Sequence, residues 1–338
     1  MTAPRQVLPG TTYLVTRRCA QRQFLLRPSK LVNEIFSYVL AIAAQRFGVQ
    51  VHAFRVLSNH FHLVVTDPHA RLPAFHQYLD ALVARAINAS LGRWETFWAP
   101  NSYSAVTLVS AADVLDKTAY VLANPVAASL VRLGRLWPGL WSAPEQIGGD
   151  RLEVNRPKQF FHPNGSLPEK VSLQLTAPPG FAAPDAFRDQ LVAALAEHEA
   201  QAHAANREFL GVERVLAQRP TAQPRPGEPR RGLNPRIASR DKWKRIEALG
   251  RLVEFLREYR AAWAARRAGR DATFREARTC SVSRTASSAL APVRRERASG
   301  GRAALATPSP GSDLRVARPA CTGCIESGRD PGCSAIEP

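Results

Sequence analysis

The stretch SNHFHLVV, at residues 58–65, decides how this chain is interpreted. Successive side chains of a β-strand point to opposite faces, so His60 and His62 share one face with Val64, while three apolar side chains share the other. One face of the strand is therefore expected to pack in the core. The other presents two imidazoles side by side.

Strands and amphipathic helices alternate around this stretch. Strands rich in β-branched and aromatic residues are predicted at 11–19, 49–58, 60–65 and 104–109. Helices with apolar residues at three-and-four spacing are predicted at 29–47, 72–91 and 111–123. The order βαββαβα predicts an α+β fold with a ferredoxin-like antiparallel sheet and its helices on one face.

Beyond residue 150 the pattern loosens, and a mostly helical extension is expected. Its first part, 151–218, holds a strand in VSLQLTAPPG (171–180) and a helix at 185–209. After a Pro- and Arg-rich linker at 219–240, the part at 241–274 is a basic amphipathic helix. That helix is either an arm that contacts nucleic acid or a packed helix with a solvated basic face.

The last part of the chain, 275–338, has a different composition. It is rich in Arg, Ala, Ser, Gly and Pro without a sustained apolar period, which predicts disorder. A shift of the reading frame near residue 275 is the alternative explanation. Cys321 and Cys324 have the spacing of a metal-binding pair, but a single such pair is a weak signal.

The charge of the chain points to a polyanionic partner. Its 46 Lys and Arg against 28 Asp and Glu give a formal net charge of +18, which favours nucleic acid but does not choose DNA over RNA or a membrane surface. The sequence lacks the apolar core of a signal peptide and any run long enough for a membrane span. A cytoplasmic protein without membrane contact is therefore expected.

The predicted third helix carries a polar stripe that could complete a site with the histidines. Asp113, Lys117, Tyr120 and Asn124 fall on one face, so Tyr120 is presented rather than buried. Pro125 is expected to end or bend the helix at Asn124. Two neutral imidazoles can ligate a divalent ion, although half-buried histidines on a polar face are the simpler interpretation.

Together these motifs resemble a known family. NHFHLVV at 59–65, AYVLANPVAASLV at 119–131 and the order of elements over 11–131 are similar to the HUH transposases that use one catalytic tyrosine, especially the REP-associated branch. The resemblance implies a ferredoxin-like catalytic domain, here within residues 1–150. It covers a little more than a third of the chain, and no function is carried onto the remainder.

The resemblance implies a role for four residues. His60 and His62 would hold Mg²⁺ or Mn²⁺, Tyr120 would be the nucleophile, and Asn124 stands where relatives carry a Gln or Asn as third ligand. A hard divalent ion with few protein ligands keeps positions open for phosphate oxygens. Tyrosine, with an ordinary pKa of about 10, needs help to lose its proton.

Basic and aromatic residues are the candidates for DNA contact. Phosphates could be bound by Arg17, Arg18, Arg55 and Lys117, and unpaired bases could stack on Trp94 and Trp98. Aromatic residues clustered between two elements more often form a small core.

The expected function is a metal-dependent nickase and transposase that cleaves and rejoins single-stranded DNA near hairpins through a covalent 5′-phosphotyrosine. One alternative is a nucleic-acid-binding protein on the same fold that no longer cleaves. Another is a metal-dependent hydrolase without a covalent step, although neither motif offers the Glu or Asp base that a water-activating site needs. Relatives include monomers and dimers, and the sequence leaves a homodimer open.

Overall fold

The computed structural model of the chain describes residues 4–100, 103–205, 208–224, 235–274 and 277–278. Most of the predicted tail lies outside these residues, and with it the expected disorder, the alternative reading frame and the Cys321–Cys324 pair. The middle of the predicted linker also lies outside them.

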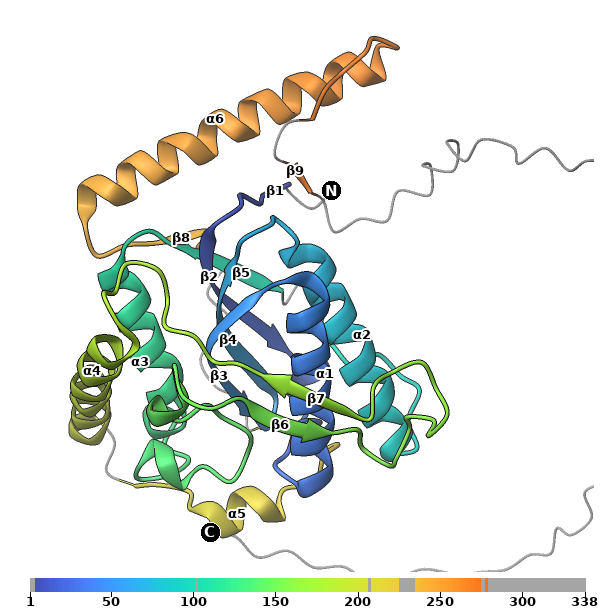
Figure 1. Cartoon of the computed structure of the whole chain (residues 1–338), viewed down its shortest axis with the longest axis vertical. Coiled ribbons are helices and arrows are strands. Elements are labelled where there is room, and N and C mark those ends of the chain that lie inside the picture. The colour runs from blue at the N-terminus through green and yellow to red at the C-terminus, as the bar shows by residue number, and fades with distance from the viewer. Residues whose placement is uncertain (1–3, 101–102, 206–207, 225–234, 275–276, 279–338) are drawn as a thin grey trace, which may run out of the picture. The chain divides into compact units, whose positions relative to one another are not determined.

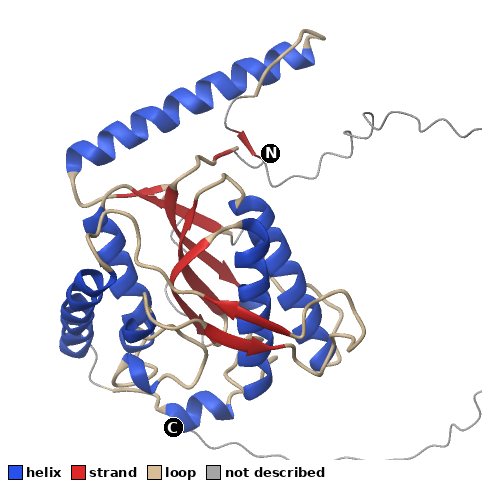
Figure 2. Ribbon diagram, viewed as in Figure 1, coloured by secondary structure: helices blue, strands red, loops and turns tan. Residues whose placement is uncertain are grey.

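A five-stranded sheet forms the centre of the described structure (Figures 1 and 2). Its strands, in spatial order, are β3 (Gln50–Leu57), β4 (His60–Asp67), β2 (Thr11–Arg18), β5 (Ser104–Leu108) and β8 (Ile237–Ala238). The first four strands pair antiparallel, as predicted. The short β8 pairs parallel to β5, which makes the sheet mixed. The α+β class is confirmed.

Two small sheets accompany the central one. The strand β1 (Arg5–Gln6) pairs with β9 (Ala277–Arg278), and β6 (Leu152–Asn155) pairs with β7 (Lys170–Leu173). The strand expected within 171–180 is therefore present as β7, one residue earlier. Its buried Val171 and Leu173 join the main core, beside α1.

Six α-helices are described. They are α1 (Lys30–Phe47), α2 (Leu72–Ser90), α3 (Ala111–Ala127), α4 (Pro184–Ala205), α5 (Val212–Ala217) and α6 (Lys242–Arg267). Local sequence explains where several begin and end. The Ser29 side chain accepts a hydrogen bond from the Val32 backbone at the start of α1, and Gly48 ends the helix with a left-handed φ of 66°.

The helices lie on both faces of the sheet, which corrects the expectation of one face. The helices α1 and α2 cover the face that carries Phe61, whose ring lies 5.1 Å from that of Phe36. The helix α3 packs on the opposite face, where Val64 joins Val114 and Val121 in a second apolar cluster. Each face of β4 is thus covered, and α3 faces the histidines.

Pro125 does not end α3 at Asn124. The helix runs on to Ala127, where the backbone N–H of Ala128 donates to the Asn124 carbonyl over 2.9 Å. Proline removes one helical donor, but the residues around it, Ala123, Asn124 and Val126, are buried. Tertiary packing therefore outweighs the local preference of proline in this turn.

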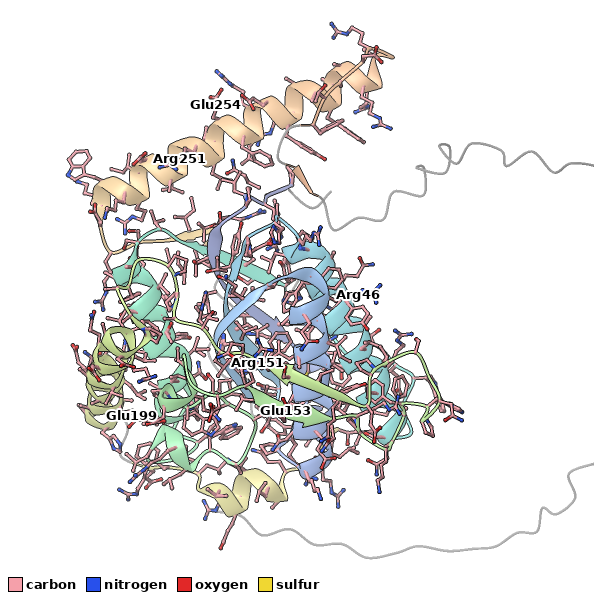
Figure 3. All side chains as sticks on the ribbon, viewed as in Figure 1. Arg46, Arg151, Glu153, Glu199, Arg251 and Glu254 are labelled. Atoms are coloured by element: carbon pink, nitrogen blue, oxygen red, sulfur yellow. The ribbon has the colours of Figure 1, made fainter. Side chains whose placement is uncertain are left out.

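The extension packs on the predicted catalytic domain. The helix predicted at 185–209 is present as α4, which lies along α3 and buries Phe187 and Leu191. In α6, charged side chains such as Arg251 and Glu254 lie along the helix (Figure 3), and only Phe255 of its described side chains is buried. Its apolar residues Ile246, Leu249 and Val253 are exposed, although the sequence predicts an amphipathic helix. Among the described residues, no helix is both long and apolar enough to cross a membrane.

Candidate functional site

The two histidines lie at the start of β4 on the face that α3 covers. Their ring centroids are 4.8 Å apart and their planes are nearly perpendicular. In the ladder with β2, Thr16 lies opposite His62 and Arg18 lies opposite His60. His62 is buried, whereas His60 is half-buried and closer to the end of the sheet.

Neighbouring side chains hold one nitrogen of each imidazole. The Nδ1 atom of His60 lies 2.6 Å from the amide oxygen of Asn59, and Nδ1 of His62 lies 2.7 Å from the hydroxyl of Thr16. An amide oxygen can only accept, so Nδ1 of His60 donates and its Nε2 keeps a lone pair. The Thr16 hydroxyl can accept in the same way from His62. This arrangement is the one that metal-binding histidines usually show.

Both imidazoles are held neutral. Burial lowers the pKa of His60 well below its ordinary value, and electrostatic interactions with His62, Arg18 and Arg22 lower it further. Burial, with Arg18 and Arg55, lowers the pKa of His62 to about 3. A metal ligand has to be unprotonated, so the pair is in the required state at neutral pH.

The helix α3 brings two further predicted residues to the histidines. The Asn124 amide nitrogen lies 3.4 Å from Nε2 of His62. Tyr120, one turn earlier, places its ring centroid 6.1 Å from that of His62 and is 38% exposed. Because a half turn of the amide exchanges its nitrogen and oxygen, Asn124 can present an oxygen at the same place.

These residues fit a divalent ion with few protein ligands. The two imidazole rings lie next to each other, and the Asn124 amide contacts Nε2 of His62. Among the described residues, no group of three His, Cys, Asp or Glu side chains forms a competing metal site. Imidazole is a poor ligand for Mg²⁺, which prefers oxygen, so the donor set favours Mn²⁺ of the two predicted ions. The side chain of Asn124 is one methylene shorter than the Gln that some relatives carry at this position.

Asp116 organises the side of α3 next to the tyrosine. Its carboxylate binds Lys117 Nζ over 2.9 Å, Arg240 Nη2 over 2.6 Å and His198 Nε2 over 3.3 Å. Burial acts to raise the pKa of Asp116, but its bonds to these three groups outweigh burial and lower it. Lys117 in turn lies 5.8 Å from the ring centroid of Tyr120. Lys117, which was predicted to contact DNA, thus lies near Tyr120 and forms a salt bridge with Asp116.

Asp113, in the first turn of α3, also contacts Arg240 of the extension. It forms a capping box with Ser110, and its Oδ1 accepts from the backbone N–H of Arg240 over 2.7 Å. The sequence predicts Asp113 on the same polar stripe as Tyr120, but its side chain caps the N-terminus of α3. Sequence reasoning missed Thr16, Asn59 and Asp116, whose roles depend on contacts with other elements.

Two residues predicted to contact DNA are buried, which corrects those assignments. Arg55 is fully buried opposite His62, where its Nη1 donates to the Gly134 carbonyl over 2.9 Å and its guanidinium stacks on Trp141. Trp98 is 7% exposed and donates to the Asp80 carbonyl. Trp98 belongs to the small aromatic core that was the alternative interpretation.

The other candidates for DNA contact remain accessible to different extents. Arg18 is exposed at the end of β2, and Trp94 is 89% exposed. Arg17 lies on the opposite face from the histidines and pairs with Asp80 at 3.3 Å. The structure therefore separates Arg18, beside His60, from a second group around Trp94.

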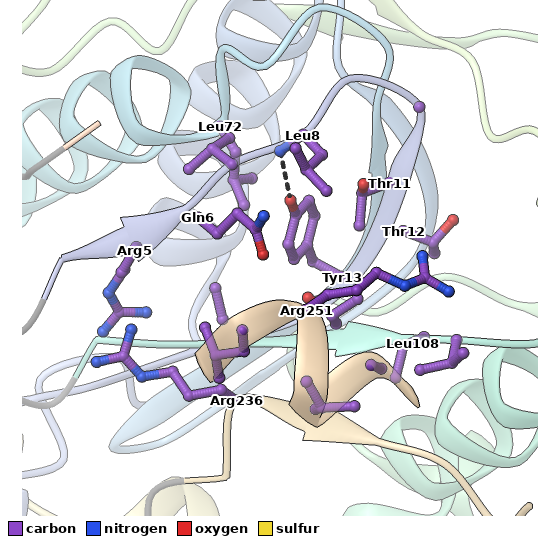
Figure 4. A pocket seen from close by; sticks show the side chains of 18 of the residues that line it. Arg5, Gln6, Leu8, Thr11, Thr12, Tyr13, Leu72, Leu108, Arg236 and Arg251 are labelled. Atoms are coloured by element: carbon purple, nitrogen blue, oxygen red, sulfur yellow. Dashed lines mark hydrogen bonds between the residues drawn. The ribbon is translucent and has the colours of Figure 1, made fainter. Parts of the chain in front are cut away.

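A cavity of about 350 Å³ lies under α6, away from the histidines. Arg5, Arg236 and Arg251 line it together with Tyr13, whose hydroxyl accepts from the Leu8 backbone (Figure 4). Each arginine has a partner: Tyr103 for Arg5, the Pro4 carbonyl for Arg236 and Glu247 for Arg251. None of the predicted metal ligands reaches this cavity, so it is not part of the candidate site.

Comparisons with known proteins give distant similarities of structure. No family model and no curated protein matches the chain. A REP-associated tyrosine transposase bound to a REP hairpin matches with a TM-score of 0.37 and 16% identity, over 43% of this chain and 84% of that one. A Deinococcus radiodurans R1 protein described as a transposase matches with a TM-score of 0.26 and 20% identity, over 32% of this chain and 85% of that one. Because these similarities are distant and partial, function has to be argued from the site.

Proposed function

We propose that this protein nicks and rejoins single-stranded DNA near hairpins, with Tyr120 as nucleophile. The observation that carries the proposal is the setting of His62. Its ring is held through Nδ1 by Thr16 and faces Asn124 with Nε2, while the partly exposed Tyr120 lies one helical turn from Asn124. A partly exposed tyrosine thus lies next to two neutral imidazoles and an amide.

In the proposed step, the Tyr120 hydroxyl attacks a backbone phosphorus. A bond forms between the tyrosine oxygen and phosphorus, and the bond from phosphorus to the 3′ oxygen breaks. The phenol proton passes to water, and the released 3′ oxygen gains a proton. Rejoining reverses these changes with the 3′ hydroxyl of another strand, so no ATP is consumed.

The residues around the tyrosine have separable tasks. His60 and His62 would hold the ion with Asn124, and Thr16 and Asn59 would keep both rings in the tautomer that leaves a lone pair on Nε2. When bound, the ion would orient the scissile phosphate and offset the charge that develops on its oxygens. Lys117, held by Asp116, adds a positive charge where a DNA phosphate would approach Tyr120.

The test is formation of a protein-linked strand. Purified full-length protein is incubated with Mn²⁺ and a panel of single-stranded DNA hairpins labelled at the 5′ or 3′ end, and then resolved on a denaturing gel. We expect an adduct that carries the 3′-end label, because Tyr120 retains the 5′ phosphate of the downstream fragment. The adduct should vanish in Tyr120→Phe and persist in Tyr78→Phe, a half-buried tyrosine of α2 that packs against Phe47.

Two outcomes would remove the proposal. Binding of the hairpins without an adduct in any of them would favour the non-cleaving alternative. Cleavage that survives in Tyr120→Phe would favour a hydrolase that uses water.

A further inference from the structure

The cavity under α6 is lined by segments that lie far apart in the sequence. Residues of β1 and β2, of β5 and the start of α3, and of β8 and α6 all contribute to it (Figure 4). Its volume of about 350 Å³ lies near the lower end of the range of about 300–1,000 Å³ that is usual for ligand sites. The cavity therefore has the size for one small molecule.

The charged side chains in the lining all carry the same sign. They are Arg5, Arg236 and Arg251, and the lining contains no Asp, Glu or Lys among the described residues. A recess whose charged walls have one sign concentrates the electrostatic field and attracts the opposite charge. The cavity therefore favours an anion.

Two of these arginines are brought together by backbone contacts. Arg236 Nη1 donates to the carbonyl of Pro4, the residue before Arg5, over 3.1 Å, and Arg5 Nη2 donates to the Tyr103 carbonyl over 2.7 Å. Figure 4 shows the guanidinium groups of Arg5 and Arg236 pointing toward each other. Because two positive charges at close range repel, an anion bound between them would relieve the repulsion.

The arginines retain donors for such an anion. The bond to Pro4 uses only Nη1 of Arg236, and the ion pair with Glu247 uses only Nη2 of Arg251. A guanidinium has five N–H donors in a planar fork that matches the oxygens of a carboxylate or a phosphate. Arg236 can therefore keep its contact with the backbone and bind a ligand at the same time.

Apolar and aromatic side chains form much of the remaining wall. These are Tyr13, Leu72, Leu108, Val114 and Leu252. An inorganic ion would leave these surfaces without contact, whereas an apolar body would bury them and gain stability in proportion to the area covered. The lining thus fits a ligand that combines an anionic group with an apolar part.

We propose that the cavity binds a small organic anion, with its carboxylate or phosphate between Arg5 and Arg236 and its apolar body against Tyr13 and Leu252. Arg251 would add to the positive potential. Because Arg236 precedes β8 and Leu252 belongs to α6, an occupant would connect these segments to β1 and β2. The proposal goes beyond the proposed function and does not depend on it.

The test measures the binding of simple probes to the full-length protein. Benzoate and phenyl phosphate carry the two candidate anionic groups on the same ring, and benzyl alcohol is their uncharged counterpart. Saturation-transfer difference NMR gives the affinity of each. We expect at least one anion to bind, and benzyl alcohol to bind about tenfold more weakly or not at all, because it lacks the charge-assisted hydrogen bonds.

A charge variant assigns the binding to this cavity. Arg236→Gln keeps a polar side chain near Pro4 but removes the charge, so it should weaken binding of the anion by about tenfold. The matched control is Arg257→Gln, which removes an exposed arginine of α6 that pairs with Glu254 and does not line the cavity. It should leave the affinity unchanged.

A second variant fills the cavity without changing its charge. Ala248→Phe places a ring in the space from α6 and should abolish binding while the melting temperature stays the same or rises. Ala261→Phe, at an exposed position of the same helix, should bind the anion normally.

Three outcomes would overturn the proposal. The first is that neither anion binds, or that benzyl alcohol binds as tightly as they do. The second is that either Arg236→Gln or Ala248→Phe binds the anion with unchanged affinity. The third is that a single-stranded oligothymidylate loses affinity in Ala248→Phe but not in Ala261→Phe, which would assign the cavity to nucleic acid.

Discussion

Asn124 approaches Nε2 of His62 to 3.4 Å, and Thr16 holds Nδ1 of the same ring at 2.7 Å. One imidazole of β4 is therefore fixed between a neighbouring strand and the helix that carries the tyrosine.

Replacing Thr16 by Val should weaken metal binding. Without the hydroxyl, His62 loses the partner that fixes its tautomer, and loss of such a partner typically lowers metal affinity by about 10–100-fold. Mn²⁺ titration followed by electron paramagnetic resonance of the free ion measures the affinity directly. Thr16→Ser keeps the hydroxyl and should restore binding, and equal affinities in both variants would show that Thr16 has no such role.

Changes at Asn124 should separate ligation from packing. Asn124→Ala should raise the Mn²⁺ concentration needed for the protein-linked strand by about tenfold or more, the effect expected when a supporting group at a metal site is lost. Asn124→Gln retains an amide oxygen with longer reach and should lose less. If Ala and Gln variants require the same Mn²⁺ concentration as the unmodified protein, the amide does not contribute to ion binding.

Substitution of Arg55 should lower stability without changing the salt dependence of DNA binding, and substitution of Arg18 should do the reverse. Arg55→Met keeps an apolar stem against Trp141 but leaves the Gly134 carbonyl without its donor, so the free energy of unfolding should fall by about 1–3 kcal/mol. Arg18→Ala should change stability little. In the plot of log affinity against log salt concentration, the slope should shrink by about one for Arg18→Ala and stay the same for Arg55→Met.

A smaller slope for the Arg55 variant would contradict its burial. The comparison also requires that both variants be measured at a temperature where each is folded, which circular dichroism establishes.

Stability should fall as the pH drops from about 6.5 to 4. Burial lowers the pKa of His52 to about 4, and its ring bonds the Thr66 hydroxyl and the Thr176 carbonyl at 2.7 and 2.8 Å. Between about pH 6.5 and 4, His52 is protonated in the unfolded chain but not in the folded chain. The free energy of unfolding therefore falls with pH until the ring is also protonated in the folded chain. The full loss from His52 is about 3 kcal/mol, and it is absent above pH 6.5.

Urea unfolding at pH 5 and pH 7.5 measures this loss. His52→Gln cannot titrate and should lose less stability between the two pH values than the unmodified protein does. His60 and His62, whose pKa values are also lowered, act in the same direction and leave a remaining slope. An unchanged pH dependence in His52→Gln would show that this ring does not resist protonation.

Much of the fold could be predicted because its elements follow local patterns. The alternation in residues 58–65 fixed which side of β4 carries His60 and His62, and the cap and stop residues of α1 bounded that helix. Arg55 could not be placed in the same way. Its burial depends on Trp141 and Gly134, which lie some eighty residues further along the chain, and an arginine within a strand is ordinarily expected at the surface.

The sequence indicated the principal residues of the candidate site but not the residues that hold them in place. The spacing of Tyr120 and Asn124 on one helix is visible in sequence, whereas the strand register that sets Thr16 against His62 is not. The left-handed backbone of Phe160 could not be predicted, because a phenylalanine in the sequence does not indicate a positive φ. Pro125 misled for the opposite reason: its local effect is strong, and the burial of its neighbours outweighs it.

The bonds from α3 to Arg240 limit how the protein can be trimmed for practical use. Asp113 accepts from the Arg240 backbone and Asp116 from its guanidinium, so both acids depend on a residue well over a hundred positions later. A fragment that ends before Arg240 would lose the hydrogen bond to Asp113 and the salt bridge to Asp116. Its helix α3, which carries Tyr120, should therefore be less stable. A shortened version of this chain should therefore be made only by removing residues that follow α6.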